Sequence, residues 1–148
     1  MRAFLFLKDP DDHAFAEKVL KGLGCDDIVT DPDRIGTGEF HYAVVQVFDE
    51  TVDHLRYDMA ADHPLMLQLA EFVRSHPECY VLAITHKPCE NDGSLAHAIG
   101  ADYWLTDGFM GMLTSHLGYA REYHRAVKGI PSWDAEEGAA TTASQPAA

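Results

Sequence analysis

Cysteine, basic side chains and long apolar runs are all scarce in this sequence of 148 residues. The three cysteines, Cys25, Cys79 and Cys89, are odd in number and form no C-x-x-C pair, which indicates free thiols in a reducing compartment rather than a disulfide framework. Lysine and arginine total 11 against 24 acidic residues, so the formal net charge is −13. Because this charge repels phosphate backbones and anionic lipid, neither nucleic acid nor a membrane is an expected partner.

Signals for secretion, membrane insertion and nucleotide binding are missing as well. The apolar run at the N-terminus stops at Lys8, too soon for a signal peptide, and no stretch is long enough to cross a bilayer. The glycine pairs within residues 22–24 and 36–38 lack the further glycine or the lysine of a phosphate-binding loop. We therefore expect a cytoplasmic protein whose first apolar run is a buried strand.

Short apolar runs alternate along the chain with segments of helical spacing. The runs predict five strands, at residues 3–7, 28–29, 42–48, 80–84 and 103–105. Apolar residues at helical spacing predict helices around residues 15–23, 65–73 and 95–99, and a last helix of about five turns from Phe109 to Val127. Strands that alternate with helices favour an α/β fold, a doubly wound parallel sheet in a three-layer sandwich.

The folded domain is expected to span residues 1–128, followed by a disordered tail at residues 129–148. That tail is rich in alanine, threonine and proline, and it cannot bury enough apolar surface to offset the entropy lost on ordering. Residues 49–63 are ambiguous, and we interpret them as an addition after the third strand. In parallel sheets function lies at the carboxyl ends of the strands, which directs attention to the residues that follow each apolar run.

Several of these segments resemble the receiver domains of bacterial response regulators. Residues 100–109, Gly-Ala-Asp-Tyr-Trp-Leu-Thr-Asp-Gly-Phe, are similar to the family's G-A-D-D-Y-L-T-K-P-F run. Residues 81–85 resemble its fourth strand, which ends in a switch threonine or serine; residues 4–9 resemble its first strand and acidic pair; and residues 42–48 resemble the strand that carries the phospho-acceptor aspartate. This resemblance covers residues 1 to about 128, and it implies a flavodoxin-like sheet of five strands in the order 2-1-3-4-5.

The resemblance implies a phosphorylation site from which this sequence departs. The family's acidic pair reads Lys8-Asp9 here, so one of its two acids is retained, and Thr85 retains the switch hydroxyl. Gln46 stands at the position of the acceptor aspartate, and Asp107 at that of the phosphate-binding lysine. Mg²⁺ needs oxygen ligands from several carboxylates, and a carboxylate is also the nucleophile on phosphorus. We therefore predict a degenerate site with no metal, no cofactor and no catalytic residue. Lys8 and Asp107 either pair across neighbouring strand ends or remain solvated charges.

The leading functional hypothesis is a phosphorylation-independent pseudo-receiver, a signalling adaptor rather than an enzyme. In the family, the face built by the fourth helix, the fifth strand and the last helix is the usual output and dimer surface. We expect a protein partner or a second copy of the chain to bind there. The side chains proposed for this switch and interface surface are Trp104, Tyr103, His97, Tyr119 and Tyr123, with Met110 and Met112 beside them.

Other classes of function stay open. Asp9, Gln46, Thr85, His86 and Asp107 could line a repurposed pocket for a small ligand or a metal, or serve an enzyme of unknown reaction, since fold does not dictate function.

A weak metal candidate lies in the ambiguous segment. His54, Asp58 and Asp62 are spaced at i, i+4 and i+8 and would share one face of a helix, although the polar face of a short helix explains the same spacing. Neither an H-E-x-x-H motif nor an EF-hand loop supports it.

Overall fold

The computed structural model describes residues 1–35, 38–47, 63–85 and 92–123, and it describes no side chains for residues 92–95, 107–109, 121 and 123. Five strands form one sheet in these ranges: β1 (Arg2–Phe6), β2 (Asp27–Val29), β3 (Tyr42–Gln46), β4 (Tyr80–Thr85) and β5 (Tyr103–Thr106). The order across the sheet is β2-β1-β3-β4-β5, and every neighbouring pair is parallel. The predicted fold class and strand order are confirmed.

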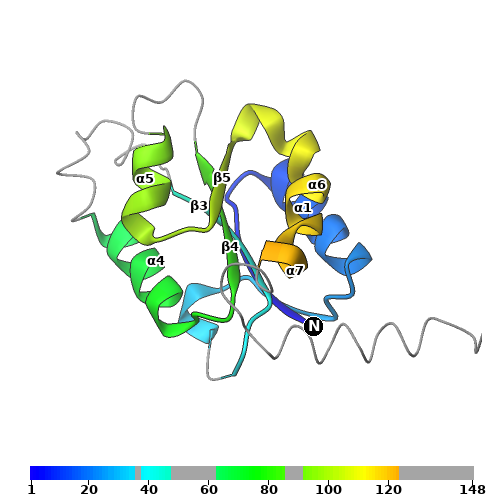
Figure 1. Ribbon diagram of the computed structural model, residues 1–148, viewed down its shortest axis with the longest axis horizontal. Helices are drawn as coiled ribbons and strands as arrows, with labels where there is room; N and C mark the ends of the chain where they lie inside the picture. Colours follow the sequence, from blue (N-terminus) through cyan, green and yellow to red (C-terminus); the bar gives the residue numbers. More distant parts are fainter. Residues whose placement is uncertain (36–37, 48–62, 86–91, 124–148) are drawn as a thin grey trace, which may run out of the picture.

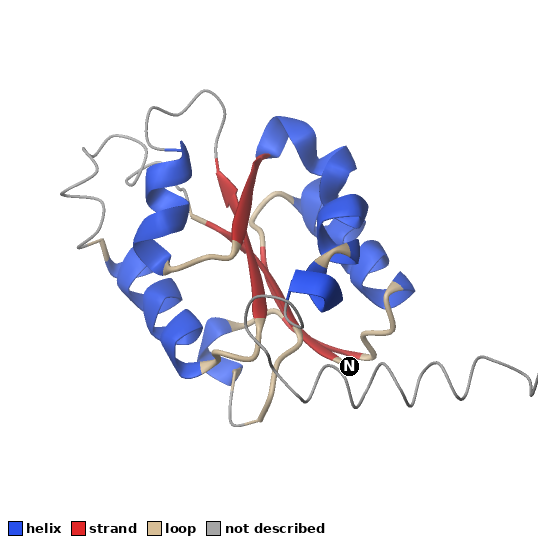
Figure 2. Cartoon of the chain, in the orientation of Figure 1, coloured by secondary structure: helices blue, strands red, loops and turns tan. Residues whose placement is uncertain are grey.

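Helices cover both faces of this sheet, as Figures 1 and 2 show. On one face lie α4 (Pro64–Ser75) and α5 (Asp92–Ile99). On the other lie α1 (Pro10–Gly22), α6 (Leu113–Gly118) and α7 (Ala120–Tyr123). Two 3₁₀ helices complete the described elements, η1 (Pro32–Arg34) after β2 and η2 (Asp107–Met112) between β5 and α6.

Local sequence explains where the two longest helices begin. Asp9 caps α1 with its side chain, and Pro10 follows at the first helical position, where its missing N–H group costs nothing. At α4, His63 Nδ1 accepts a hydrogen bond from Leu65 N at 3.1 Å, and Pro64 takes the first position. The helix predicted around residues 15–23 therefore begins earlier, at Pro10, whereas α4 begins one residue before the predicted range 65–73.

Alternation along the strands divides the core into two clusters, one on each face. Leu5 of β1 and Val44 of β3 pack with Leu20 of α1 and Leu113 of α6. The neighbouring strand residues point to the opposite face, where an aromatic group leads the packing. Its rings are Phe4, Phe40 and Phe72, with centroids of Phe4 and Phe72 4.8 Å apart. Each fully buried side chain of this size contributes about 1.5–3 kcal/mol.

Two expectations about helices are wrong. The last helix is not continuous from Phe109 to Val127, because the chain runs through η2, then α6, and breaks at Tyr119 before α7. Gly111 and Gly118 lie at these interruptions, and glycine lowers helix propensity by about 1 kcal/mol relative to alanine. The apolar spacing that predicts a helix around residues 15–23 begins at Phe15 and thus predicts a buried Phe15, yet this residue is 40% exposed, because the buried stripe of α1 is centred on Ala16 and Leu20.

Other sequence predictions fall outside the described residues: the segment 49–62, the tail at residues 129–148 and the end of the domain at residue 128. Within the described ranges, no helix combines the length and the apolar character needed to cross a bilayer.

Candidate functional site

Gln46 stands at the carboxyl end of β3, in the middle of the sheet. Its side chain is buried, and its Oε1 accepts a hydrogen bond from the backbone N–H of Lys8 at 2.6 Å. The backbone pairing of β1 with β3 reaches Phe6 and Val45. The amide of Gln46 therefore holds these strands together beyond the end of their ladder, and the sequence resemblance aligns this residue with the acceptor carboxylate of a receiver domain.

Asp9 follows Lys8 and caps the helix that comes directly after it. Its Oδ1 accepts hydrogen bonds from the backbone N–H groups of Asp11 and Asp12, both at 2.9 Å, which caps α1. The carboxylate lies at the N-terminus of the helix, toward which the first backbone N–H groups point. One carboxylate oxygen of Asp9 is thus engaged in capping the helix.

Thr85 ends β4 and is completely buried. Its hydroxyl donates a hydrogen bond to the carbonyl oxygen of Leu105 in β5 at 3.4 Å. Gln46 pairs with Ile84 in the sheet, and Val47 N donates to Ile84 O at 2.9 Å. The structure therefore brings Lys8, Gln46 and Thr85 together at the carboxyl ends of neighbouring strands, as the alignment of strand ends predicted.

The described side chains at this edge do not fit a Mg²⁺ site. They offer one carboxylate, Asp9, whose Oδ1 already accepts two N–H groups, and one neutral amide oxygen, which Lys8 N already occupies. Mg²⁺ is bound through carboxylates in near-ideal octahedral geometry. More widely, the described part of the chain contains no group of three or more acidic, histidine or cysteine side chains placed to hold a metal.

Some predicted site residues cannot be placed. The side chain of Asp107 lies outside the described residues, so its pairing with Lys8 stays a prediction. His86 of the alternative pocket also lies outside them, as do the metal candidates His54, Asp58 and Asp62.

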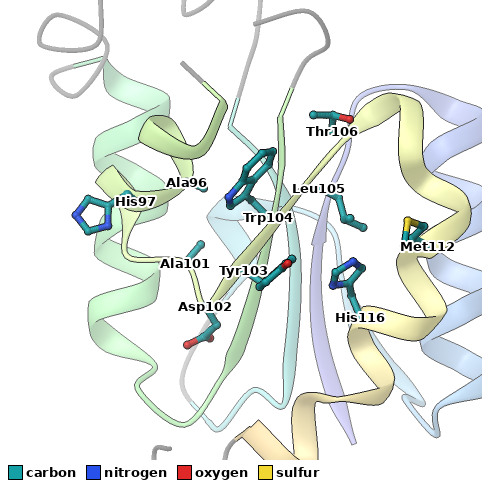
Figure 3. Close-up of a pocket in the computed structure, with 10 residues that line it drawn as sticks. All are labelled: Ala96, His97, Ala101, Asp102, Tyr103, Trp104, Leu105, Thr106, Met112 and His116. Atoms are coloured by element: carbon teal, nitrogen blue, oxygen red, sulfur yellow. The ribbon is translucent and has the colours of Figure 1, made fainter. Parts of the chain in front are cut away.

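A groove of about 670 Å³ lies on another part of the molecule, across β5 and between α5 and α6 (Figure 3). Its size falls within the usual range for small-molecule and cofactor sites. Residues from α5, the turn before β5, β5, η2 and α6 line it: Ala96, His97, Ala101, Asp102, Tyr103, Trp104, Leu105, Thr106, Met112 and His116.

The Gly-Ala-Asp segment positions β5 at the floor of this groove. Gly100 ends α5 with a φ of 80°, in the left-handed region that favours glycine. Asp102 Oδ2 then accepts a hydrogen bond from Val81 N at 2.7 Å, which fixes the start of β5 against β4. The motif that carried the family resemblance is therefore a structural device for entering the last strand.

Aromatic side chains on β5 alternate between the two sides of the groove. Trp104 lies toward α5, whereas Tyr103 and Leu105 lie toward α6 (Figure 3). The ring of Tyr103 packs on the ring of His116, with centroids 4.7 Å apart. Burial lowers the pKa of His116 below its usual 6.5, which favours the neutral imidazole in this stack.

Three exposed large hydrophobic side chains line this groove, and that of Tyr119 follows α6. The described residues include six exposed side chains of this kind, and four belong to β5, η2 and the turn after α6: Tyr103, Trp104, Met112 and Tyr119. Aromatic and methionine side chains are enriched in protein interfaces. The clustering marks this surface, hereafter the β5 face, as the strongest candidate for binding.

The β5 face contains most of the side chains predicted for an interface. Tyr103, Trp104 and His97 line the groove, and Tyr119 is 64% exposed one residue after α6. The side chain of Tyr123 lies outside the described residues. Met110 is buried, whereas its neighbour Met112 is exposed.

Sequence reasoning missed several of the lining residues, among them His116, whose ring packs on Tyr103. His116 follows Met112 by four positions, so helical spacing from that methionine would have indicated it.

The geometry defines a class, a five-stranded receiver-like α/β domain, and comparison with known proteins agrees with it. No family model and no curated protein sequence matches the chain. Among solved structures, the response regulator DrrB of Thermotoga maritima, an OmpR/PhoB homologue, matches with a TM-score of 0.63 at 16% identity, over 83% of this chain and 53% of DrrB. The chain thus spans about half the length of that regulator.

Two further structures are similar. One is an atypical orphan response regulator, described as having a phosphorylation-independent regulatory mechanism, with a TM-score of 0.54 at 16% identity, over 81% of this chain and 94% of that one. The other is the CheY-like protein TadZ of Pseudomonas aeruginosa PAO1, with a TM-score of 0.56 at 13% identity, over 81% and 98%. At such identities the likeness establishes the fold, and this chain has the receiver-like fold that its sequence motifs indicated.

Proposed function

We propose that this chain is a receiver-like signalling module that works in the cytoplasm without phosphorylation and without catalysing a reaction. Its output would be the binding of a protein partner at the β5 face. The observation that carries the proposal is the hydrogen bond from Lys8 N to Gln46 Oε1 at 2.6 Å. It occupies the neutral amide that the sequence resemblance aligns with the acceptor carboxylate of a receiver domain.

The chemistry of the amide supports the first half of this proposal. An acyl phosphate forms when a carboxylate oxygen attacks phosphorus, and the uncharged oxygen of a carboxamide is a poor nucleophile. The side chain of Gln46 is also buried and held by β1, so it does not face a phosphoryl donor freely. The description of the similar orphan regulator as phosphorylation-independent is consistent with this interpretation.

The β5 face supports the second half. Tyr103 is 51% and Trp104 is 39% exposed, although both belong to a strand of the central sheet. Apolar patches of this kind on soluble domains mark interaction sites. An acidic protein of net charge −13 would attract a partner that carries positive charge.

Phosphorylation independence is tested with acetyl phosphate and Mg²⁺. We expect the intact mass of the full chain to stay unchanged, while a conventional receiver domain treated in parallel gains a phosphoryl group. Beryllofluoride with Mg²⁺ should likewise leave the amide NMR spectrum of this chain unchanged. A phosphoryl adduct on any aspartate of this chain would overturn the proposal.

A second candidate is the binding of a small ligand, which one observation favours. Thr106 is 8% exposed and lines the groove, and its hydroxyl has no hydrogen-bond partner among the described residues. Buried polar groups are nearly always hydrogen-bonded, so a ligand that bonds to Thr106 would remove an energetic cost. A saturable rise in melting temperature with a metabolite, absent in Thr106→Val, would favour this candidate.

A further inference from the structure

The outer side of β5 is an open edge of the sheet. Among the described strands, β5 pairs with β4 alone, and Figure 1 shows it as the last strand on its side. The carbonyl of Leu105 faces β4, because it accepts the hydroxyl of Thr85. Successive carbonyls of a strand point to opposite sides, so the carbonyl of Trp104 faces away from the sheet. An extended chain that lay in the groove would meet these backbone groups.

Both sides of this edge are mostly apolar, although His97 and Asp102 on one side and His116 on the other also line the groove. On the α5 side lie Trp104 and the small residues Ala96 and Ala101, and on the α6 side lie Tyr103 and Met112. Side chains of an added strand would point alternately to the two sides. Consecutive apolar residues, rather than alternating ones, would therefore suit this edge.

Charge decides between the possible occupants. None of the described residues that line the groove is lysine or arginine, and the whole chain carries a net charge of −13. A second copy of the chain would bring another −13 to the same surface, which opposes association, whereas a segment with basic residues would be attracted. A positively charged partner is the occupant that the electrostatics favour.

We propose that β5 accepts an extended segment of a positively charged partner protein as a sixth strand. The segment has about four consecutive apolar residues, matching the length of β5 at about 3.3 Å per residue, with lysine or arginine on both sides. Main-chain hydrogen bonds to β5 supply affinity, and the two apolar sides select the residues. This inference rests on the proposed function in placing the partner on the β5 face.

The test uses synthetic peptides and the full chain labelled with ¹⁵N. The probe is the capped peptide Lys-Lys-Val-Phe-Ile-Val-Lys-Lys, titrated while amide NMR shifts are recorded. We expect saturable shifts centred on residues 103–106, together with slower hydrogen exchange of the backbone amides there. A peptide with the same apolar residues and glutamate in place of lysine should bind at least about tenfold more weakly at low salt.

Backbone methylation separates strand addition from other ways of binding. Two variants of the probe carry N-methyl groups on alternate amides, one set on each edge of the extended peptide. Methylation of the edge that faces β5 should weaken binding by about tenfold or more, because it removes hydrogen bonds, while methylation of the other edge should leave binding nearly unchanged.

Several outcomes overturn the inference: no saturable shift with the lysine-flanked peptide, equal effects of both methylated variants, or shifts away from β5. A dimer of the chain alone in light scattering that Tyr103→Lys dissociates would also overturn it, because the occupant of the edge would then be a second copy. The proposed function fails separately, through a phosphoryl adduct or through partner capture that does not depend on Trp104. Failure of strand addition is therefore distinguishable from failure of the proposed function.

Discussion

The two edges of the sheet are finished in different ways. At one edge, β2 has only three residues, and charged groups surround it. Asp27 pairs with Arg2 Nε at 3.1 Å, an ionic contact without hydrogen-bond alignment, and Asp26 pairs with the N-terminal amine at 3.2 Å. At the other edge, β5 presents Tyr103 and Trp104 half-exposed and has no charged side chain of its own.

This difference indicates that one edge of the sheet resists pairing with other chains while the other edge is suited to binding. Short edge strands with charged side chains resist unwanted pairing with other chains. The β2 edge has both features. The β5 edge has aromatic residues in a groove instead, and exposed apolar surface of this kind is typical of interaction sites. We therefore interpret β2 as the protected edge and β5 as the functional one.

The largest expected effect is on stability, and it compares a core residue of β5 with one of β2. Leu105 of β5 is 7% exposed and belongs to the core cluster with α1 and α6, whereas Ile28 of β2 is only partly buried. We expect Leu105→Ala to lower the free energy of unfolding by about 2–5 kcal/mol, since it leaves a cavity. Ile28→Ala should cost less than half as much, because it buries less surface. Chemical denaturation measures both, and equal losses would show that β2 is anchored as firmly as β5.

A smaller effect separates binding from stability at the β5 face. Trp104→Ala should weaken capture of the partner from a lysate of the native cell by about thirtyfold, or about 2 kcal/mol, as for an aromatic residue at the centre of an interface. Because Trp104 is 39% exposed, the free energy of unfolding should change by no more than about 1 kcal/mol.

Phe15→Ala on α1 is the matched control for Trp104→Ala, since Phe15 is 40% exposed and lies away from the groove. It should leave capture unchanged. Equal losses of captured protein in the two variants would contradict a specific role for the β5 face.

The sequence predicts the interior of this fold better than its surface. Apolar runs such as residues 42–46 and 80–84 form strands because burial on both faces of a parallel sheet needs uninterrupted apolar residues. The break at Tyr119 is harder to predict, since Leu113, Leu117 and Ala120 keep helical spacing across it and all are buried. Periodicity records which residues face the core, and it is insensitive to a local break in the helix axis.

The candidate site shows the same limit. Order along the chain places Lys8, Gln46 and Thr85 at neighbouring strand ends, because parallel strands share one carboxyl edge. The use of the Gln46 amide depends on a side-chain hydrogen bond to a backbone group 38 residues away, which no local pattern encodes. The groove on β5 likewise needs the distance between α5 and α6, which tertiary packing sets.

The smallest expected effect compares the two edges through their response to acid. Near β5, burial lowers the pKa of His116 below 6.5, so the unfolded chain takes up this proton first. Stability should therefore fall as the pH drops through 6.5 toward the lowered pKa, and His116→Gln should remove this part of the slope. Near β2, the hydrogen bond from the N-terminal amine lowers the pKa of Asp26 below 3.8.

The stabilisation from Asp26 is present above pH 3.8 and is lost as the pH falls through the lowered pKa, so the advantage of the wild type over Asp26→Asn should vanish only there. Denaturant unfolding of both variants from pH 7.5 to pH 3, alongside the wild type, measures the two windows. His116, near the groove on β5, and Asp26, near β2, titrate in separate pH ranges. We therefore expect the loss of stability near neutral pH to come from His116, and the loss at acidic pH to come from Asp26. A loss that appears in one shared window for both variants would contradict this assignment, since it would mean that the edges are not electrostatically independent.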